Sequence, residues 1–238
     1  MRREMIPELM DDPDVGRGDL DASLRFIRGV NRWLGGQRAL IGCLRAWSRR
    51  WPSGSTVSLL DVATGSADLP IAAAEWARAS GVQLAITGVD NHATTLELAQ
   101  EQVDRANDTS IELERLNAGE ITDRFGPNSF DYVHAGMFLH HLTELEAMTV
   151  LRKMDRVARR GVIWNDLSRS RLALLGAHVI TAGQREIIRH DATVSVRKGF
   201  TRREALNMAR RVGIDYARYR AMPLSQRFVV AGEKPEAW

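Results

Sequence analysis

The sequence predicts an α/β protein with a doubly wound, mostly parallel sheet of seven strands, and three observations support this. Short apolar runs alternate with helical periodicity from residue 55 onward. The first run ends in an acid followed by small residues, in "LLDVATGSADLP" (59–70). The last two, in "IDYARYRAMPLSQRFVVAGEK" (214–234), flank a proline-containing turn, which predicts a closing antiparallel hairpin. Strands that alternate with helices of this length form a sheet covered on both faces.

Composition limits the class of protein. At 238 residues and 44% apolar content, the chain can bury the core of one substantial domain. Its 33 basic and 30 acidic residues are spread along the chain, whereas a nucleic-acid binder more often collects its arginines into a patch, so no nucleic-acid partner is expected. Cys43 is the sole cysteine, which excludes a disulfide framework. The chain has no signal-peptide core and no apolar run of ~18 residues, which predicts a cytoplasmic protein without a membrane span.

Two units are expected along the chain. Residues 1–54 predict an N-terminal helical cap, because apolar side chains recur at spacings of three and four over 19–50, with a break at Gly35-Gly36. Residues 1–18, at the start of this cap, are polar and are expected to be loosely held. The main α/β domain is expected over 55–238.

The strands and helices of the main domain follow in order. Five strands are predicted before the hairpin, over "TVSLLDV" (56–62), "QLAITGVD" (83–90), "IELERLN" (111–117), "FDYVHAGM" (130–137) and "RGVIWNDL" (160–167). Helices are predicted over 69–80 and 93–106, and capping boxes at Thr143/Glu146 and Thr201/Glu204 start two more. The alternation lapses at about 168–199, where an apolar helix over 172–188 followed by a polar loop predicts an inserted helical lid.

The small-residue turn after the first strand predicts a ligand site. In open parallel sheets, ligands bind beyond the carboxyl ends of the strands, and small side chains let a ligand approach the backbone. The dinucleotide pattern G-x-G-x-x-G is a poor match, because Asp68 would stand at its last position and repel a pyrophosphate. The pattern D-x-G-x-G-x-G fits better, with Asp61 at the acid and Gly65 at the central glycine. Ala63 and Ala67 replace its other glycines, a change that is costly where φ is positive.

This turn resembles the nucleotide-binding signature of the class I S-adenosylmethionine-dependent methyltransferases. The resemblance implies S-adenosylmethionine as cofactor and S-adenosylhomocysteine as product. It implies that Asp90, at the end of the second strand, takes both ribose hydroxyls, and that Asn91 or His92 borders the adenine. Asn117-Ala118 stands where the family often has Asp-Ala against the adenine amino group. The implied cofactor-binding residues are Asp61, Ala63, Thr64, Gly65, Asp90, Asn91, Asn117 and Ala118.

A second stretch narrows the resemblance. "FDYVHAGMFLHHL" (130–142) is similar to the FD-x-V…L-H-H-L stretch of the family's small-molecule branch, which includes the ubiquinone and menaquinone methyltransferases. With the terminal hairpin, the resemblance covers residues 55–235 and implies a Rossmann-like fold.

Three histidines are candidates for a catalytic base. His140 and His141 follow the fourth strand, and histidine can accept a phenol or enol proton near neutrality. The alternative is that one of them shapes the cofactor pocket or caps the next helix. His190, beside Asp191 in the predicted polar loop, is a further candidate. His134 lies inside a strand and is expected to be a core residue.

Candidate substrate contacts are fewer. Asn165-Asp166 ends the fifth strand and either binds substrate or caps the exit of the chain. Arg171 could recognise a carboxylate, and Trp33 could join the 172–188 helix in an apolar lid, which would suit an aromatic or lipid-like acceptor. Ordinary core packing explains the apolar residues nearly as well. Asp166 alone is not the carboxylate cluster of the metal-dependent catechol enzymes, so no metal is expected.

The favoured function is methyl transfer to a small, largely apolar acceptor, at the oxygen of a phenol, hydroxyquinone or polyketide-like compound. C-methylation of a quinone ring comes second. An RNA or protein methyltransferase, a nicotinamide-dependent oxidoreductase and a non-catalytic binding module remain alternatives, because fold alone does not determine function.

Overall fold

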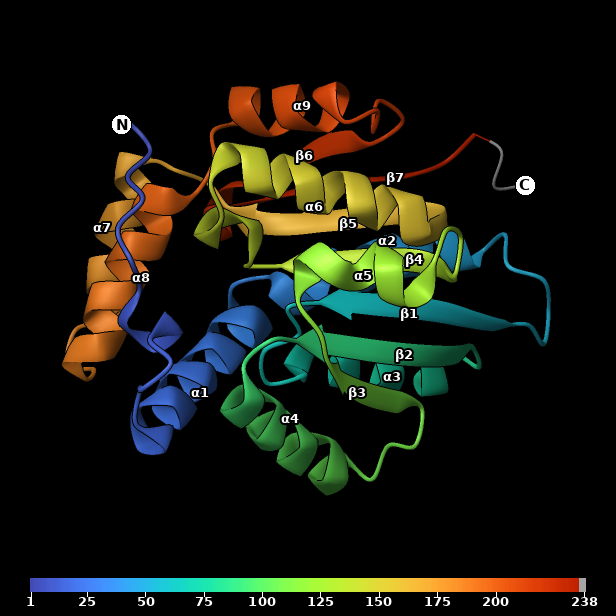
Figure 1. Cartoon of the computed structure of the whole chain (residues 1–238), viewed down its shortest axis with the longest axis horizontal. Coiled ribbons are helices and arrows are strands. Elements are labelled where there is room, and N and C mark those ends of the chain that lie inside the picture. Colours follow the sequence, from blue (N-terminus) through green and yellow to red (C-terminus); the bar gives the residue numbers. More distant parts are fainter. Residues whose placement is uncertain (236–238) are drawn as a thin grey trace.

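Seven strands form one sheet in the order β3-β2-β1-β4-β5-β7-β6 (Figure 1). The computed structural model describes residues 1–235, so the end of the predicted 55–238 domain, residues 236–238, lies outside the described residues. The five parallel strands are β1 (Thr56–Val62), β2 (Gln83–Asp90), β3 (Ile111–Arg115), β4 (Phe130–Gly136) and β5 (Ala158–Leu167). β7 (Arg227–Glu233) runs antiparallel to both β5 and β6 (Arg218–Met222), which confirms the expected C-terminal hairpin.

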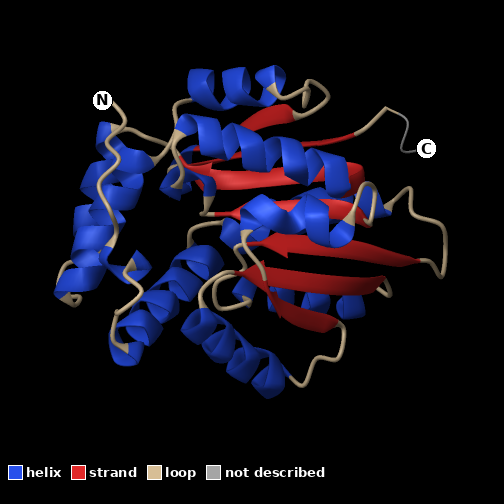
Figure 2. Cartoon of the chain, in the orientation of Figure 1, coloured by secondary structure: helices blue, strands red, loops and turns tan. Residues whose placement is uncertain are grey.

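Helices cover both faces of the sheet, as the alternating pattern predicted (Figure 2). One apolar core gathers residues of α2 (Gly36–Ser48), α3 (Asp68–Ala79) and α4 (Ala93–Ala106) against the strands. The other gathers α5 (Ile121–Phe125), α6 (Glu144–Val157) and α9 (Arg202–Arg211). The capping boxes at Thr143 and Thr201 begin α6 and α9, so both helix starts are confirmed.

The order of strands places a crevice at one end of the sheet. β1 pairs with β2 on one side and with β4 on the other, so the direction in which the chain adds strands reverses between β1 and β4. Ligands of open α/β sheets bind at the carboxyl ends of the strands at such a reversal. α1 (Arg17–Trp33) lies beside this end of the sheet (Figure 1), and Gly35, with φ of +88°, allows the sharp turn into α2.

The inserted segment differs from the single helix and polar loop that the sequence predicted. It forms two helices, α7 (Arg171–Ile180) and α8 (Glu186–Lys198). The first ends before Gly183, whose φ of +81° is left-handed and interrupts the helical path. The stretch predicted as a loop is helical, and it buries Val194 and Val196 as well as the polar residues Asp191, Ser195 and Lys198. His190 and Asp191 are therefore helical residues.

The N-terminal segment (residues 1–15) was expected to be loosely held, and this expectation is wrong. The segment packs along α8, and its short 3-10 turn η1 (Leu9–Asp11) is fixed there by one carboxylate. The backbone N–H groups of Leu9 and Met10 donate to Oδ1 and Oδ2 of Asp191, at 2.8 and 3.0 Å. Glu8 is only 4% exposed, and its Oε1 accepts a hydrogen bond from Lys198 at 2.9 Å. Two buried charged residues of α8, Asp191 and Lys198, therefore hold the segment in place.

We expect Asp191→Ala to release the N-terminal segment, because two backbone N–H groups lose their common acceptor. Cleavage within residues 1–15 by a protease at low concentration should become several-fold faster than in the unchanged protein. Glu186→Ala, an exposed residue at the start of the same helix, is the matched control and should leave the cleavage rate unchanged. Equal cleavage rates in both variants would show that Asp191 does not hold the segment.

Among the helices of residues 1–235, none is both long and apolar enough to cross a membrane.

Candidate functional site

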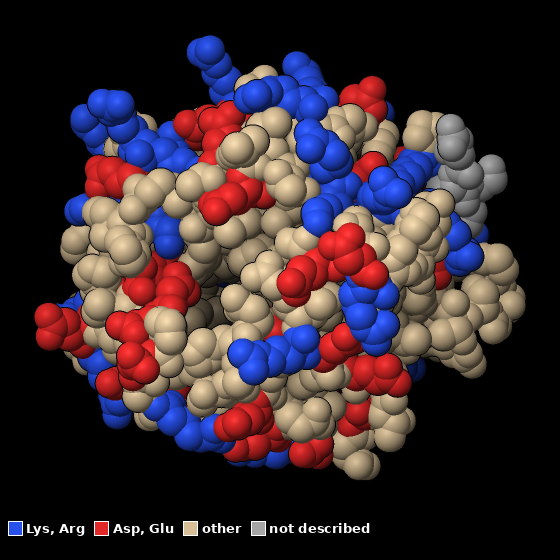
Figure 3. Space-filling view, in the orientation of Figure 1, with Lys and Arg blue, Asp and Glu red and all other residues tan. Residues whose placement is uncertain are grey.

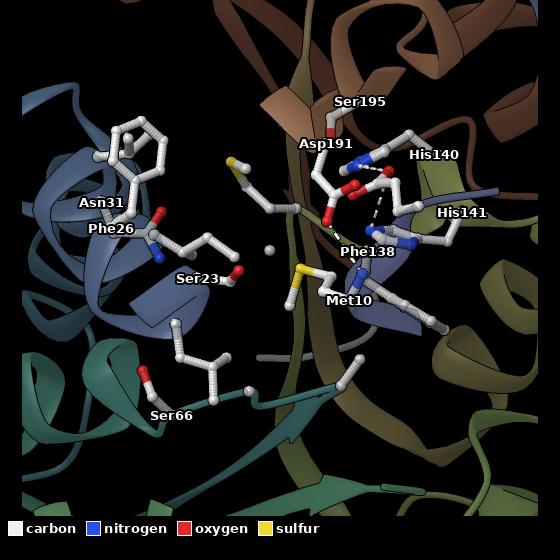
Figure 4. Close-up of a pocket in the computed structure, with 18 of the residues that line it drawn as sticks. Met10, Ser23, Phe26, Asn31, Ser66, Phe138, His140, His141, Asp191 and Ser195 are labelled. Atoms are coloured by element: carbon white, nitrogen blue, oxygen red, sulfur yellow. Dashed lines mark hydrogen bonds and ion pairs between the residues drawn. The ribbon is translucent and has the colours of Figure 1, made fainter. Parts of the chain in front are cut away.

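A cavity of about 790 Å³ opens at the carboxyl ends of β1, β2 and β4. Its other walls come from α1, α7, α8 and the N-terminal segment. Figure 4 shows His140, His141 and Asp191 on one side of this cavity and Ser23, Asn31 and Ser66 on the opposite side. The cavity thus lies where the reversal of strand order predicts a ligand.

The loop between β1 and α3 has an unusual backbone. Ala63, Gly65 and Ala67 all have positive φ, at 55°, 57° and 57°. These are the positions of the three glycines in D-x-G-x-G-x-G, so both alanines occupy conformations that glycine would adopt without strain. A left-handed conformation costs an L-residue about 1–2 kcal/mol. The loop keeps the backbone shape of the signature at the expense of local strain.

We expect Ala63→Gly to raise the free energy of unfolding by about 0.5 kcal/mol. The substitution relieves backbone strain of about 1–2 kcal/mol, which exceeds the cost of about 0.4–1 kcal/mol from the greater entropy that glycine gives the unfolded chain. Ala67 is the matched comparison, because it has the same φ but its methyl group is fully buried. Ala67→Gly loses about 0.8 kcal/mol of methyl burial and should give no gain. Urea denaturation of the two variants measures both values. A loss of stability in Ala63→Gly would show that its backbone is unstrained.

Asp61 organises the loop from the end of β1. It is paired in the sheet with His134 of β4, and its Oδ1 lies 2.5 Å from Nδ1 of that fully buried histidine. Its Oδ2 accepts a hydrogen bond from Thr64 Oγ1 at 2.8 Å. His134 is therefore the core residue that was expected, and Asp61 fixes both the loop and the neighbouring strand.

Asp90 connects the loop to the end of β2. Its Oδ2 accepts from the backbone N–H of Gly65 and its Oδ1 from that of His92, both at 3.0 Å. Burial raises the pKa of Asp90 above its ordinary value, although these N–H groups oppose the shift. Each carboxylate oxygen keeps a lone pair for a further donor, and Asp90 lines the cavity with Asn91 and His92.

Asn117 and Ala118 lie outside the set of residues that line the cavity. The Asn117 side chain accepts from the backbone N–H of Gly119 at 2.7 Å and caps a short turn, η2 (Ala118–Glu120). Arg115, from the end of β3, reaches the cavity from this side. The structure therefore brings together six of the eight implied cofactor residues, all from β1, β2 and the loops that follow them.

Three hydrogen-bonded residues, Asp68, Asn31 and Arg227, lie beside the loop, and the sequence did not indicate that they meet. Asp68 Oδ2 accepts from Asn31 Nδ2 at 3.0 Å, and Asn31 Oδ1 accepts from Arg227 Nη2 at 2.9 Å. Burial lowers the pKa of Arg227 to about 10, against the opposing effect of Asp166 and Asp68. Arg227 is 1% exposed and lines the cavity, and within residues 1–235 its Nε and Nη1 have no hydrogen-bond partner. A fully buried cation with unused donors is suited to an anionic group of a ligand.

Asp166, which does not line the cavity, holds the ring of His140. His140 lies in the short turn η3 (Leu139–His141), and its Nδ1 is 2.6 Å from Oδ1 of Asp166. Oδ2 of Asp166 accepts from Trp164 Nε1 at 3.1 Å, so the carboxylate is fixed in turn. Asn165 and Asp166 are both fully buried and do not line the cavity, so the structure places them behind the site. Asp166 positions His140.

Glu8 faces both histidines on the cavity side. Its Oε1 lies 3.6 Å from Nε2 of His140 and 3.7 Å from Nε2 of His141. Burial alone would lower the pKa of His140, but Asp166 and then Glu8 raise it to about 9. Burial alone would raise the pKa of Glu8, but His141, His140 and Lys198 lower it well below its usual range. We call Glu8, His140 and His141 the histidine–glutamate cluster. Glu8 could not be predicted from the sequence, since a single acid in a polar segment forms no pattern.

The remaining sequence candidates lie away from the cavity. The side chain of His190 is 37% exposed and lies 2.9 Å from Asp191 Oδ1. Trp33 is 72% exposed and Arg171 is also exposed. The three residues are not among those that line the cavity. Lys, Arg, Asp and Glu are interspersed over the face seen in Figure 3, without a continuous basic stripe on that face.

Known proteins resemble the chain over this same region. Residues 59–161 match a family described as a methyltransferase domain. The demethylmenaquinone methyltransferase of Listeria welshimeri is 38% identical over 104 residues, which are 44% of this chain and 41% of that one. The Geobacillus stearothermophilus enzyme of the same name is 35% identical over 117 residues, 49% of this chain and 47% of that one. The matched segment thus spans less than half the length of these relatives.

Solved structures share the fold. Magnesium protoporphyrin IX methyltransferase from Synechocystis, with bound S-adenosylhomocysteine, superposes with a TM-score of 0.57 at 14% identity and 84% coverage of both chains. PigF, also with S-adenosylhomocysteine, gives a TM-score of 0.61 at 19% identity, covering 95% of this chain and 61% of that one.

Proposed function

We propose that this chain methylates a small, largely apolar acceptor. The proposal rests on its place among the class I S-adenosylmethionine-dependent methyltransferases and on its distant homology to the demethylmenaquinone methyltransferases. The observation that carries the proposal is the junction at Asp90, where the carboxylate joins the β1–α3 loop to the end of β2 beside a large cavity.

The residues of this junction fit S-adenosylmethionine. Asp90 has free lone pairs for two ribose hydroxyls, and Asn91 and His92 follow it on the adenine side. Gly65 leaves open space, since a Cβ built there would meet no atom nearer than 3.9 Å. The unused donors of Arg227 suit the cofactor's carboxylate. When bound, the cofactor supplies an already activated methyl group.

The rest of the cavity suits an apolar acceptor. Its wall opposite the strand ends consists mainly of aliphatic and aromatic side chains from three helices. They include Leu20, Leu24, Phe26, Ile27, Val30, Ala173, Ala177, Ile180 and Ile188. Such a wall excludes water and binds a ring or alkyl chain without recognising charge. In the proposal, the phenol, hydroxyquinone or polyketide-like acceptor lies against it.

The histidine–glutamate cluster stands at the polar end of this wall. We assign the acceptor hydroxyl to this end, which favours oxygen over ring carbon as the methylated atom. Holding acceptor and methyl donor in line can lower the barrier by up to about 7–11 kcal/mol. A histidine that accepts the hydroxyl proton contributes about 10²–10⁴-fold in rate. His140, whose pKa is raised to about 9, already holds a proton near neutrality, so we assign this role to His141, whose ring Asp11 keeps in place.

Methyl transfer from radiolabelled S-adenosylmethionine tests the proposal. The acceptors are phenols, resorcinols and hydroxyquinones with alkyl chains of increasing length, with total RNA and a denatured protein mixture as competing acceptors. We expect label in an O-methyl product of an alkylated phenol or hydroxyquinone. Asp90→Ala should abolish transfer, whereas Asp123→Ala, an exposed acid far from the cavity lining, should retain it. Label only in RNA or protein would contradict a small-molecule acceptor.

A further inference from the structure

Three potential metal-binding atoms converge at the acceptor end of the cavity. They are the Nε2 atoms of His140 and His141 and a carboxylate oxygen of Glu8, and all lie within 4.8 Å of one another. The two distances that involve Oε1 of Glu8 are 3.6 and 3.7 Å. Ligands at about 2.0–2.2 Å from a zinc ion in tetrahedral geometry stand about 3.3–3.6 Å apart. The two Glu8–histidine distances therefore nearly fit one shared cation, and the two imidazole nitrogens, within 4.8 Å of each other, would close to the same separation.

The far side of each histidine is arranged in the way that metal-binding histidines require. Nδ1 of His140 lies 2.6 Å from Asp166, and Nδ1 of His141 lies 2.7 Å from Asp11. Because a carboxylate accepts from Nδ1–H, a cation that displaces the Nε2 proton to solvent would meet a lone pair that faces Glu8. Histidine ligands usually donate their other ring N–H to a carboxylate, which fixes the tautomer and raises basicity. Both members of the pair have this partner.

One of these atoms is a buried polar atom without a hydrogen bond within residues 1–235, since its ion-pair partner, Oε1 of Glu8, lies 3.6 Å away. Nε2 of His140 is inaccessible to solvent and makes no hydrogen bond among the residues that the structure describes. Leaving such an atom without a partner costs free energy, and native structures usually provide one. The atom points toward Glu8 beside the cavity, and all three cluster residues belong to its lining. This independent observation indicates that the cluster has a ligand of its own.

We propose that Glu8, His140 and His141 bind one divalent transition-metal cation, of the class represented by Zn²⁺. Two imidazoles and one carboxylate are the donor set that such ions accept, with the remaining positions open to solvent or substrate. The donors lie more than 130 positions apart in the sequence, and the ion would fasten the N-terminal segment to η3. Lys198 keeps the Glu8 carboxylate in place by its hydrogen bond to Oε1, the same oxygen that faces both histidines.

A bound cation would also act on the acceptor hydroxyl. This effect on the acceptor rests on the proposed function, whereas the binding of the cation does not. With the cation bound, both nitrogens of each ring would be engaged, so the proton of an acceptor hydroxyl at an open position would go to water instead of to a histidine. The cation would favour this loss by stabilising the oxyanion. Oxygen acceptors such as phenols or enols are the substrate class that benefits. The ring carbon of a quinone would gain less.

Metal binding by tag-free full-length protein tests the inference directly. After treatment with a chelator, the protein is equilibrated with Zn²⁺ and the bound metal is measured by mass spectrometry, and Co²⁺ absorption reports ligation by imidazole. We expect one ion per chain, with affinity reduced at least about 100-fold in Glu8→Gln and His141→Ala. Asp11→Asn should weaken binding about 10–100-fold through the orientation of His141. His178→Ala, an exposed histidine of α7, is the matched control and should bind as the unchanged protein does.

Absence of stoichiometric binding, or unchanged affinity in Glu8→Gln and His141→Ala, would overturn the proposal. Circular dichroism and binding of S-adenosylhomocysteine verify that the variants fold, and Asp11→Asn changes only a half-exposed carboxylate at the rim. Binding of S-adenosylhomocysteine by the metal-free protein separates the two proposals. If that binding fails while Zn²⁺ binds, the proposed function fails and the metal site stands. The reverse result leaves the methyltransferase proposal intact without the metal.

Discussion

Asp90→Ala is expected to weaken binding of S-adenosylhomocysteine at least about 100-fold, because hydrogen bonds to a charged group are worth about 1.5–3 kcal/mol each and two are lost. The substitution also removes the acceptor for the backbone N–H groups of Gly65 and His92, so the loop loses its attachment to β2. Isothermal titration calorimetry measures the change.

The control for Asp90 is Asp104→Ala, which removes an exposed acid from the next helix and should leave the affinity unchanged. Asp90→Asn keeps the size of the side chain and one acceptor oxygen, so its affinity should lie between the other two. Near-normal affinity in Asp90→Ala would show that this carboxylate does not hold the ribose.

Asp61→Ala is expected to lower the free energy of unfolding by about 3 kcal/mol, because removing one member of a buried, hydrogen-bonded pair costs about 3–5 kcal/mol and a charge-assisted hydrogen bond about 1.5–3 kcal/mol. His134 would be left fully buried with neither ring nitrogen bonded to a described residue. At about 2–4 °C per kcal/mol for a chain of this size, the melting temperature should fall by about 6–12 °C. Thermal denaturation without ligand measures the loss apart from any effect on cofactor binding.

Asp61→Asn should recover part of this stability, since its amide oxygen can still accept from His134. Asp123→Ala removes an acid whose side chain is 79% exposed, and it should change the melting temperature by less than about 2 °C. A loss in Asp61→Ala no larger than that in Asp123→Ala would mean that the Asp61–His134 pair contributes nothing to stability.

Local patterns were sufficient to predict the sheet. Alternating strands and helices, the capping boxes at Thr143 and Thr201 and the C-terminal hairpin are all encoded within short windows, and all are confirmed. The segment after β5 was mispredicted because α8 buries polar residues, Asp191, Ser195 and Lys198, together with its apolar ones. Its polar residues, which include His190, concealed the apolar spacing of Ile188 and Val194.

The candidate site was predictable where one strand end and its loop supply the residues. Asp61, Gly65 and Asp90 belong to such loops, and the structure brings them to one cavity. Glu8 and Arg227 could not be found in this way, because their significance depends on partners more than 130 positions distant, at His140 and Asn31. Propensity and spacing carry no information on such contacts.

The two alanines of the loop illustrate another limit. A sequence shows that Ala63 and Ala67 replace glycines, but not whether φ is positive at those positions. The structure shows left-handed backbone at both, so the loop retains the shape of the glycine-rich signature. The substitution therefore costs stability and leaves the cofactor's approach to the backbone open at Gly65.

Calorimetric titration of the unchanged protein with S-adenosylmethionine, S-adenosylhomocysteine and NAD tests the central claim most directly. We expect S-adenosylmethionine and S-adenosylhomocysteine each to bind one per chain with micromolar or tighter affinity. NAD should not bind, because Asp68 in the cavity lining would repel its pyrophosphate. Binding of NAD in preference to both adenosyl compounds, or binding of none of the three, would contradict the assignment of this cavity to methyl transfer.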